Sequence, residues 1–471
     1  MRWGRLGDRL HRAALLLAVL AAVVGGLAIA GLTWWLLWWF LGAKSETPNQ
    51  LDLTKIALSV AAGVGGAVAL VVAYRRQRDL ERGRFAELFG AAARQLGDAD
   101  AAVRIAGVYA MAGVADEFSA PSRRQQCIDV LCGYLQLPYD PVAGANHLVS
   151  RAESAEEAGT KVERVYQFRQ NDREVRRAIV RVIAQHLRPS VDISWSACNI
   201  TFNGAVLEKV DFRDAAFSGR HTSFAGATFI GPSTFERARF DGHHLTFRGA
   251  TFRDGPALFD HATFDTSRIE KREPAGIGTT FADVTFESSV SFESAAFHGP
   301  RTNFSGARFL GARTSFQEAE FRAELTSFER AVLDGEHIAF DRAEFVGPRI
   351  TFTGAQFLAT LTAFDEARLG ASNRLRNRGT RETDFSHAEL HGGVRFPRAV
   401  LGGRTVDFTE VDFFGDISFL GTRFAAQEIH FDRPRAWVGT HFDWDDAPTR
   451  KPTSVKPNPW PPAPTSPTPP V

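Results

Sequence analysis

The stretch Phe304-Ser305-Gly306-Ala307-Arg308-Phe309 is one copy of a pattern that decides the fold of the C-terminal half of the chain. A phenylalanine recurs every 12 residues from Phe292 to Phe364, an alanine lies 3 residues after each, and Phe or Leu lies 2 residues after the alanine. Self-similarity at a fixed short period is the sequence mark of a stacked repeat. The sequence therefore predicts a solenoid in this region.

The spacing within the repeat predicts which side chains lie inside. Side chains alternate along an extended segment, so Ala307 and Phe309 point to the same side of the strand. The residues between these positions are mostly Arg, Glu, Ser and Gly, which suit contact with water. We therefore expect one bulky and one small inward side chain per face. Because stacked strands lie about 4.8 Å apart, the phenylalanines of successive coils can pack in offset columns.

This pattern is similar to that of pentapeptide-repeat proteins, which form a right-handed quadrilateral β-helix. The resemblance covers residues 194–432 and rests on 37 ladder positions, of which 32 are Phe. The chain departs from the plainest form of the family in two ways: Phe replaces Leu at the central position, and every second step is seven or six residues rather than five. Four faces then take about 24 residues per coil, which gives about nine or ten coils.

Glycine-proline pairs support this coil length but leave one interval open. Gly231-Pro232 and Gly255-Pro256 are 24 residues apart, and Gly299-Pro300 and Gly347-Pro348 are 48 apart. The interval of 44 residues between the two sets does not fit a 24-residue coil. We expect a register break at the first of two insertions, 265–280, and the second insertion, 370–384, leaves the local register equally open.

The first 78 residues are predicted to be a membrane anchor with two transmembrane helices, 13–41 and 56–74. Each apolar run is long enough to cross a hydrocarbon core of about 30 Å. Arginines precede the first run and follow the second, whereas the connection carries only two lysines, balanced by two acids. The positive-inside rule then places both termini in the cytoplasm of a multi-pass cell-membrane protein. The alternative is a signal peptide cleaved after Ala28-Ile29-Ala30.

Residues 79–189 have helical periodicity and are predicted to form a small helical domain. We expect one helix over 85–96, a second capped by Asp98 or Asp100, a third opened by a capping box at Ser122, and a last one capped by Asp172. The Ala/Glu/Gly-rich segment 140–159 is expected to be a loop. The domain resembles the helical segment before the repeats of many actinobacterial pentapeptide-repeat proteins. It can serve as a lid on the first coil or as a recognition surface.

The chain ends with two shorter predicted segments. Residues 433–447 contain Trp437, Phe442 and Trp444, which can cover the last coil. Residues 448–471 are rich in Pro, Thr and Ser and are expected to form a disordered, locally polyproline II tail.

The sequence offers few residues for chemistry. Cys127, Cys132 and Cys198 are expected to be buried reduced thiols, because their spacing matches neither a disulfide framework nor a zinc motif. We find no nucleophile motif, no phosphate-binding loop and no metal-ligand array, so no enzyme activity, cofactor or metal is expected. The one candidate contact for an anionic partner is a basic loop in the second insertion, which the alternative interpretation treats as solvated charge. Its residues are Arg374, Arg376, Arg378 and Arg381.

The sequence favours a non-enzymatic, membrane-tethered cytoplasmic scaffold that binds other proteins through the faces of a β-helical rod. The alternative comes from the family resemblance: some soluble members imitate duplex DNA and bind topoisomerases. Between Phe202 and Asp432 there are 32 acidic and 26 basic residues, which is a weak acidic excess for such mimicry. The formal net charge of the chain is +1, so nucleic-acid binding is not expected. The partner and the oligomeric state are left open.

Overall fold

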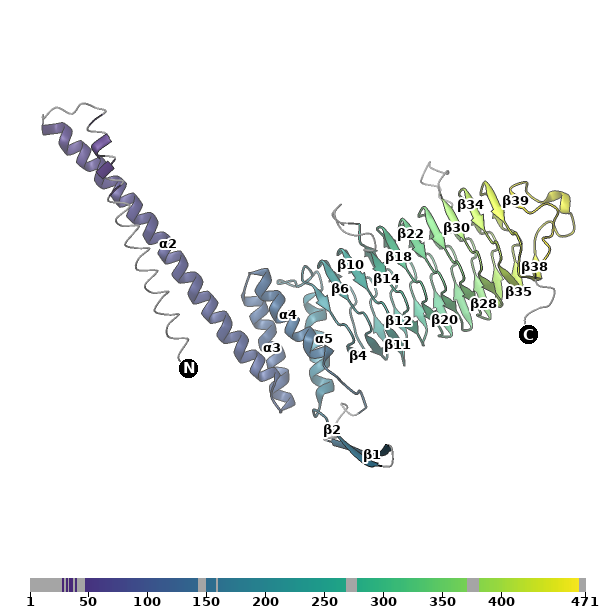
Figure 1. Ribbon diagram of the computed structural model, residues 1–471, viewed down its shortest axis with the longest axis horizontal. Coiled ribbons are helices and arrows are strands. Elements are labelled where there is room, and N and C mark those ends of the chain that lie inside the picture. Colours follow the sequence, from purple (N-terminus) through teal and green to yellow (C-terminus); the bar gives the residue numbers. More distant parts are fainter. Residues whose placement is uncertain are drawn as a thin grey trace. The chain divides into compact units, whose positions relative to one another are not determined.

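The computed structural model describes residues 28, 31–32, 34–36, 39, 47–142, 150–157, 160–267, 278–370 and 381–465. The chain divides into two compact units, Met1–Gly90 and Ala91–Val471. In its described residues, the second unit contains three complete α-helices and, after them, a β-solenoid of about 10 coils (Figure 1).

The first unit contains most of α2 (Thr47–Leu96), one continuous helix of 50 residues. Within the described residues, the segment Leu58–Leu96 is the one helix with the length and apolar composition needed to span a membrane. It overlaps the predicted second span, 56–74. The predicted first span, 13–41, lies outside the described residues apart from a few helical positions.

The predicted boundary between the anchor and the helical domain, at 78/79, is not a break in secondary structure. The sequence from Tyr74 to Phe89 is rich in Arg, Glu and Leu, which are good helix formers, and α2 therefore continues through it. The division into compact units falls later, at Gly90.

Helices α3 (Ala101–Glu117) and α4 (Pro121–Gln136) begin in different ways. The carboxylate of Asp100 caps α3 by accepting the N–H of Ala102 at 2.8 Å. The predicted capping box at Ser122 is wrong, because α4 begins at Pro121 and its N-cap, Ala120, has no side-chain hydrogen bond. Proline suits the first helical position, since it has no N–H that needs a partner.

Helix α5 (Asp172–His186) carries a buried charge instead of the predicted cap. Asn171 is the N-cap residue, and Asp172 is the first helical residue. The buried Asp172 carboxylate accepts hydrogen bonds from the Tyr134 hydroxyl at 2.5 Å and from Arg176 Nε at 2.8 Å. Arg104 Nη2 lies 3.9 Å from the same carboxylate. This network joins α3, α4 and α5.

An antiparallel hairpin of β1 (Ser150–Glu157) and β2 (Thr160–Gln167) precedes α5. The predicted loop over 140–159 is therefore wrong for the residues of β1. The partner strand contains Val162, Val165 and Tyr166, whose β-branched or aromatic side chains favour strands, and Ala152 pairs with Val165 in register. Composition of the first strand alone does not reveal this pairing.

The solenoid consists of four ladders of short parallel strands, which we call faces 1 to 4 in the order in which each coil visits them. Face 1 is an 11-stranded sheet. Its strands are β3 (Ile200–Thr201), β6 (His221–Ser223), β10 (His244–Thr246), β14 (Thr279–Thr280), β18 (Arg301–Asn303), β22 (Leu325–Ser327), β26 (Arg349–Thr351), β30 (Glu382–Asp384), β34 (Thr405–Asp407), β37 (Glu428–His430) and β39 (Val455–Lys456).

Faces 2 and 3 belong to one 17-stranded sheet. Face 2 has β4 (Val206–Glu208), β7 (Thr228–Ile230), β11 (Thr251–Arg253), β15 (Thr285–Phe286), β19 (Arg308–Phe309), β23 (Val332–Leu333), β27 (Gln356–Phe357) and β31 (Glu389–Leu390). Face 3 has β8 (Ser233–Thr234), β12 (Ala257–Leu258), β16 (Val290–Ser291), β20 (Arg313–Ser315), β24 (His337–Ala339), β28 (Leu361–Ala363) and β32 (Gly393–Arg395). The longer β35 (Asp412–Ser418) and β38 (Ala436–His441) run through both faces.

Face 4 is a 9-stranded sheet. It has β5 (Ala216–Phe217), β9 (Arg239–Phe240), β13 (Thr263–Asp265), β17 (Ala296–His298), β21 (Glu320–Phe321), β25 (Glu344–Phe345), β29 (Arg368–Leu369), β33 (Val400–Leu401) and β36 (Arg423–Phe424).

Equivalent residues of successive coils are 22 to 24 residues apart in regular coils and 32 to 34 apart where an insertion lengthens the coil. This explains the interval of 44 residues between glycine-proline pairs. Gly255-Pro256 lies between faces 2 and 3, whereas Gly299-Pro300 lies between faces 4 and 1. The interval therefore combines one lengthened coil with half a coil, and the expected register break explains only part of it.

The core is built from stacked phenylalanine rings with almost no solvent exposure. Phe316 stacks on Phe292 at a centroid distance of 5.0 Å and an interplanar angle of 1°. Within the same layer it meets Phe304 edge to face at 5.7 Å and 84°. Aromatic pairs favour both geometries, and each coil therefore supports its two neighbours. The predicted inward orientation of the phenylalanines is confirmed.

Tight turns follow the ladder phenylalanines between faces 1 and 2 and between faces 3 and 4. The N–H of Ala307 donates to the carbonyl of Phe304 at 3.0 Å, and the residue between them, Gly306, has φ 67°. A polar residue just before the phenylalanine locks the turn: Asn303 Oδ1 accepts the N–H of Ser305 at 3.0 Å. Side-chain acceptors of this kind satisfy turn N–H groups that no strand can reach.

Both ends of the solenoid are covered. At the N-terminal end, the Trp195 indole donates to Asp116 at 2.8 Å and stacks on His186 at 4.0 Å, which ties the first coil to α3 and α5. At the C-terminal end the coil continues past the predicted limit at 432, because Phe442 stacks on Phe419 at 4.8 Å.

The predicted disordered tail is wrong for residues 448–465. Its described part includes η2 (Pro448–Arg450) and β39, which pairs with β37 through the buried Val455. Trp460 then packs edge to face on Phe442 at 5.0 Å. The predicted tail residues 466–471 lie outside the described residues.

Several inward threonines place a hydroxyl among the phenylalanine columns. Within the described chain, the buried side-chain hydroxyls of Thr222, Thr279, Thr302, Thr314, Thr326, Thr362 and Thr383 have no hydrogen-bond partner. Ile350 and Val406 occupy equivalent positions of face 1. Thr422 differs, because its hydroxyl donates to the Phe396 carbonyl at 2.8 Å.

Replacing Phe316 by Ala is expected to lower the free energy of unfolding by about 3–5 kcal/mol, because it removes a fully buried ring from two stacked contacts. Urea unfolding followed by circular dichroism measures this change. Phe414→Ala is the control, since Phe414 lies outside the ladder and is only partly buried. Equal losses in the two variants would contradict the assignment of stability to the inner columns.

Thr302→Val is expected to leave stability unchanged or to raise it by up to about 1 kcal/mol, because valine keeps the shape and removes an unsatisfied buried hydroxyl. Thr422→Val is the matched variant and should lower stability by about 0.5–1.5 kcal/mol, since it removes a buried hydrogen bond to the Phe396 carbonyl, which then keeps the N–H of Ala399. Thermal unfolding of both variants in parallel distinguishes them. A loss for Thr302→Val as large as that for Thr422→Val would show that its hydroxyl has a partner.

Candidate interaction site

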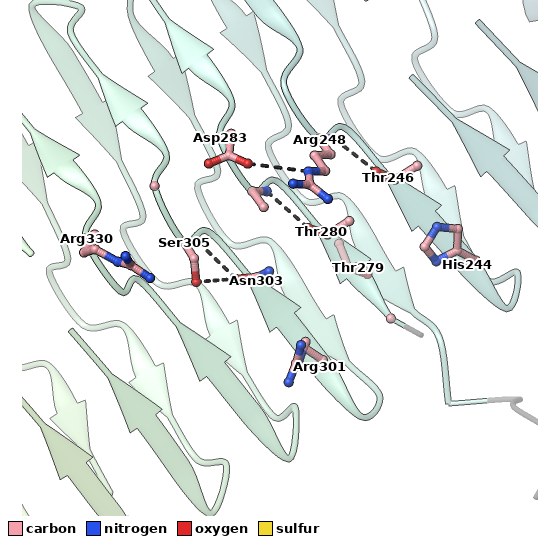
Figure 2. Close-up of a pocket in the computed structure, with 13 residues that line it drawn as sticks. His244, Thr246, Arg248, Thr279, Thr280, Asp283, Arg301, Asn303, Ser305 and Arg330 are labelled. Atoms are coloured by element: carbon pink, nitrogen blue, oxygen red, sulfur yellow. Dashed lines mark hydrogen bonds and ion pairs between the residues drawn. The ribbon is translucent and has the colours of Figure 1, made fainter. Parts of the chain in front are cut away.

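A hollow lies on face 1 of the solenoid (Figure 2). It has a volume of about 660 Å³ and lies over β10, β14, β18 and the turns that follow them. The residues that line it are His244, Thr246, Arg248, Gly278, Thr279, Thr280, Ala282, Asp283, Arg301, Asn303, Ser305, Gly306 and Arg330.

Two glycines line the hollow, and each packs closely against a neighbouring coil. Gly278 precedes β14 and occupies the position held by His244 in the coil before and by Arg301 in the coil after. A Cβ atom on Gly278 would lie 2.5 Å from the Arg301 carbonyl oxygen. A Cβ atom on Gly306 would lie 2.6 Å from Asp283 Oδ1. Both positions therefore have no room for a side chain, and longer residues such as Arg248 and Arg301 line the hollow beside them.

The polar groups of the hollow are mostly engaged in locking turns. Thr246 Oγ1 accepts the N–H of Arg248 at 3.1 Å, and Thr280 Oγ1 accepts the N–H of Ala282 at 3.1 Å. These hydroxyls therefore shape the surface, and the charged side chains are the groups left to bind a partner.

Three arginines give the hollow its positive character. Arg248 Nε lies 3.5 Å from Asp283, and both side chains are well exposed, so water screens this pair (Figure 2). Arg330 pairs with Glu329 at 2.9 Å. Arg301 is exposed and has no ion pair within 4 Å among the residues that the structure describes. Arg301 is therefore the guanidinium most available to a carboxylate or another anion.

His244 adds little charge to the hollow. Burial lowers the pKa of its imidazole, and the neighbouring His221, with its ring centroid 6.2 Å away, lowers it further. His244 is therefore neutral at physiological pH and contributes a polar edge instead of a cation.

The predicted basic loop is only partly described. Arg374, Arg376 and Arg378 lie outside the described residues. Arg381 is buried, with 6% of its surface exposed, and its Nη1 donates to the Gly370 carbonyl at 3.5 Å. Its guanidinium closes the base of the insertion and is not available to a partner. The structure thus separates Arg381 from the surface role predicted for it.

Neither thiol nor metal chemistry is evident in the described part of the chain. Cys127, Cys132 and Cys198 are free and buried, as predicted. Burial raises the pKa of Cys127 to about 11 and of Cys132 to about 12, so both thiols are protonated and unreactive. Among the described residues, no group of three or more His, Cys, Asp or Glu side chains is arranged to hold a metal ion.

The turns between faces 3 and 4 carry a column of alternating charge. Arg237 Nε lies 2.7 Å from Asp214, and Arg342 Nη2 lies 2.7 Å from Glu318. These pairs join turns of successive coils. They make this edge of the solenoid nearly neutral, so it does not present a stripe of one sign.

Asp341 lies at the same edge. Burial raises the pKa of the Asp341 carboxyl, and the like charge of Asp365 on the next coil adds to this, against the hydrogen bond from the Asp365 N–H at 2.9 Å. A raised pKa in the folded state means that ionisation of Asp341 opposes folding.

Asp341→Asn is therefore expected to stabilise the protein at pH 7, because the amide oxygen still accepts the Asp365 N–H without the charge. The wild type loses this part of its stability as pH rises from the ordinary aspartate pKa through the raised value. The advantage of the variant should thus vanish below the ordinary pKa. Thermal unfolding measured from pH 3 to pH 7 is the test, and an advantage that grows at low pH would contradict it.

Sequence reasoning did not find the hollow. Gly278 lies at the end of the first insertion, where the repeat pattern is interrupted, so its alignment with His244 and Arg301 is not readable without the strand register. The sequence did carry a signal for the polar residues that lock the turns. On face 1 the residue before the ladder phenylalanine is repeatedly Ser, Thr, Asn or Asp.

Comparison with known proteins supports the fold. Residues 202–251 match the family model described as pentapeptide repeats (9 copies). No curated protein and no solved structure gave a match. Coils of the same register continue from the matched segment to β38. Residues 202–251 are thus pentapeptide repeats, and this match together with the β-solenoid fits a pentapeptide-repeat protein.

Proposed function

We propose that this protein is a non-enzymatic, membrane-tethered scaffold that binds other proteins through the faces of its β-solenoid. The observation that carries the proposal is the division of the repeat into two sets of side chains. The inward set, Phe and Ala, is buried in continuous columns and is used up by the fold. The outward set is free to vary and lies at regular spacing, which suits binding of an extended protein surface.

The tether is proposed to have two spans. Leu58–Leu96 contains a segment suited to one crossing, where Leu58, Leu70 and Val71 are 65%, 73% and 53% exposed. The apolar run 13–41 supplies the other. With arginines before the first run and after the second, both termini lie in the cytoplasm of a multi-pass cell-membrane protein.

The solenoid is proposed to have the right-handed, quadrilateral form of its family. Four ladders per coil support a four-sided cross-section. Tight turns after two faces and wider corners after the other two are consistent with alternating five- and seven-residue steps.

The proposed contact for a partner is the hollow on face 1. Arg301, with Arg248 and Arg330 beside it, suits carboxylate groups of an acidic protein surface. Arg374, Arg376 and Arg378, which precede β30 on the same face, are proposed as further contacts for an anionic partner.

The alternative function, a DNA mimic that binds a topoisomerase, is less well supported. Mimicry of duplex DNA requires a continuous acidic stripe. The ion pairs between Arg237 and Asp214 and between Arg342 and Glu318 interrupt the acids along one edge. The hollow on face 1 adds a basic region.

Site-specific photocrosslinking in the native membrane tests the scaffold proposal. A photoreactive amino acid in place of Arg301 is expected to give discrete protein adducts from a chain that remains in the membrane pellet after an alkaline wash. The same group in place of Arg313, an exposed arginine of face 3, is the matched control and should give fewer adducts.

Two results would oppose the proposal. Release of the full chain by the alkaline wash would contradict the proposed membrane tether. The absence of adducts from position 301, or equal adducts from 301 and 313, would remove the hollow as a binding site.

A further inference from the structure

The register of face 1 brings six outward residues into one straight column. They occupy the first position of six successive strands, from β18 to β37, and each aligns with the next. The column reads Arg301, Leu325, Arg349, Glu382, Thr405 and Glu428. Its first half carries two cations and its second half carries two carboxylates.

The same division holds over the strands of face 1 from β6 to β37. On this face β6, β10, β14, β18, β22 and β26 contain no Asp or Glu, and β30, β34 and β37 contain no Arg or Lys, whereas the terminal strand β39 carries Lys456. Face 1 is therefore basic toward the helical domain and acidic toward the C-terminal end.

The charges of the column are available to a partner. Arg301, Arg349 and Glu382 are exposed, and in the part of the chain described they have no ion pair within 4 Å. Arg349 and Glu382 are aligned on neighbouring strands but do not close an ion pair. The Glu428 side chain is 64% exposed, and within the described residues its carboxylate lies 3.6 Å from His430 Nε2. The exposed column thus holds unsatisfied charge of both signs.

The charges of the column are complementary to those of the same column read in the opposite direction. If a second copy lies antiparallel on face 1, with a two-fold axis parallel to the strands and midway between β26 and β30, Arg349 faces Glu382 of that copy. The same axis brings Arg301 opposite Glu428, because each lies two strands beyond the central pair. Leu325 then faces Thr405, so no like charges meet.

The second outward column of the face is compatible with this arrangement. The same axis brings Thr351 opposite Asp384 and Ser327 opposite Asp407. Hydroxyl donors therefore face carboxylate acceptors. An isologous interface requires such self-complementarity of a single patch.

We propose that face 1 binds a second copy of this chain, in antiparallel orientation, about the axis between β26 and β30. The inference rests on the proposed function as an interaction scaffold and names the partner of face 1. Arg301 of the hollow is then held by Glu428 of the partner copy.

The expected complex is reversible. About this axis eight strands of each copy overlap, β14 to β39; at about 4.8 Å spacing they cover roughly 34 Å, and three-residue strands span only about 10 Å. To reach the roughly 800 Å² per partner that stable complexes bury, the turns beside the strands have to contribute as well. The pairs are solvent-exposed, so salt should weaken the complex.

Charge reversal in the full-length chain, solubilised in detergent, tests the proposal. Arg301→Glu and Glu428→Arg should each weaken dimerisation at low salt by about tenfold or more, because each places like charges in contact twice per dimer. The double variant should restore it. Arg301 and Glu428 are five strands apart, about 24 Å, within one chain, so restoration requires contact between copies.

Sedimentation velocity with detergent correction measures the mass relative to the 51.8 kDa chain. Arg313→Glu on face 3 is the matched control and should leave dimerisation unchanged. A monomeric wild type, single reversals without effect, or a double variant no better than either single one would overturn the proposal.

Disulfide trapping gives an independent readout. A mixture of Leu325→Cys and Thr405→Cys chains should form crosslinked dimers on oxidation, whereas either variant alone should form far fewer. The native cysteines are buried and do not compete. Equal crosslinking of all three samples would also overturn the proposal.

The two proposals fail in different ways. Adducts from position 301 with other proteins, together with a monomeric chain in detergent, would refute the second copy as partner and keep the scaffold. The absence of any adduct from position 301 would refute both.

Discussion

Stacking of inward phenylalanine rings is the interaction on which the rest of the structure depends. Each ring packs face to face on the ring of the next coil and edge to face on the opposite column, as Phe316 does with Phe292 and Phe304. Both contacts need a coil spacing near 5 Å and a fixed register. The parallel strand ladders provide that spacing, because it equals the distance between hydrogen-bonded strands. Backbone and side chains thus demand the same geometry.

Because of this agreement, the same residue types fill the interior of every coil, whereas the exposed residues can differ from coil to coil. A coil keeps its place as long as its Phe and Ala positions are filled, so exposed residues such as Arg301 and Glu428 can be chosen for charge. Because of the strand register, residues that are one coil apart in the sequence lie directly above one another and form a column on the surface. Two residues of like sign on successive coils repel, and the alternation of Asp214 with Arg237 avoids this at one edge. Face 1 instead gathers its signs in separate halves.

The repeat was predictable because one residue type at a strict period determined it. The hairpin β1–β2 and the C-terminal strand β39 were not, for different physical reasons. In the hairpin, Ala152 and the residues around it have no strand preference, and pairing with Val165 decides the structure. In the tail, prolines suggest disorder, yet Val455 and Trp460 pack on the last coil. Both errors arise where tertiary contacts outweigh local composition.

The helical cover of the first coil follows from the same uniformity of the coils. A regular coil has no feature that marks where stacking should stop, so the terminal coil needs a cover of different chemistry. The helices supply it through contacts such as Trp195 with Asp116, and the Asp172 carboxylate, held by Arg176 and the Tyr134 hydroxyl, joins the helices to one another. Breaking such a network leaves an unpaired charge in the interior, which is costly. The helices therefore pack on the first coil in one arrangement. This arrangement fixes the position of the first coil, and the register of the following coils, including the charge column of face 1, follows from it.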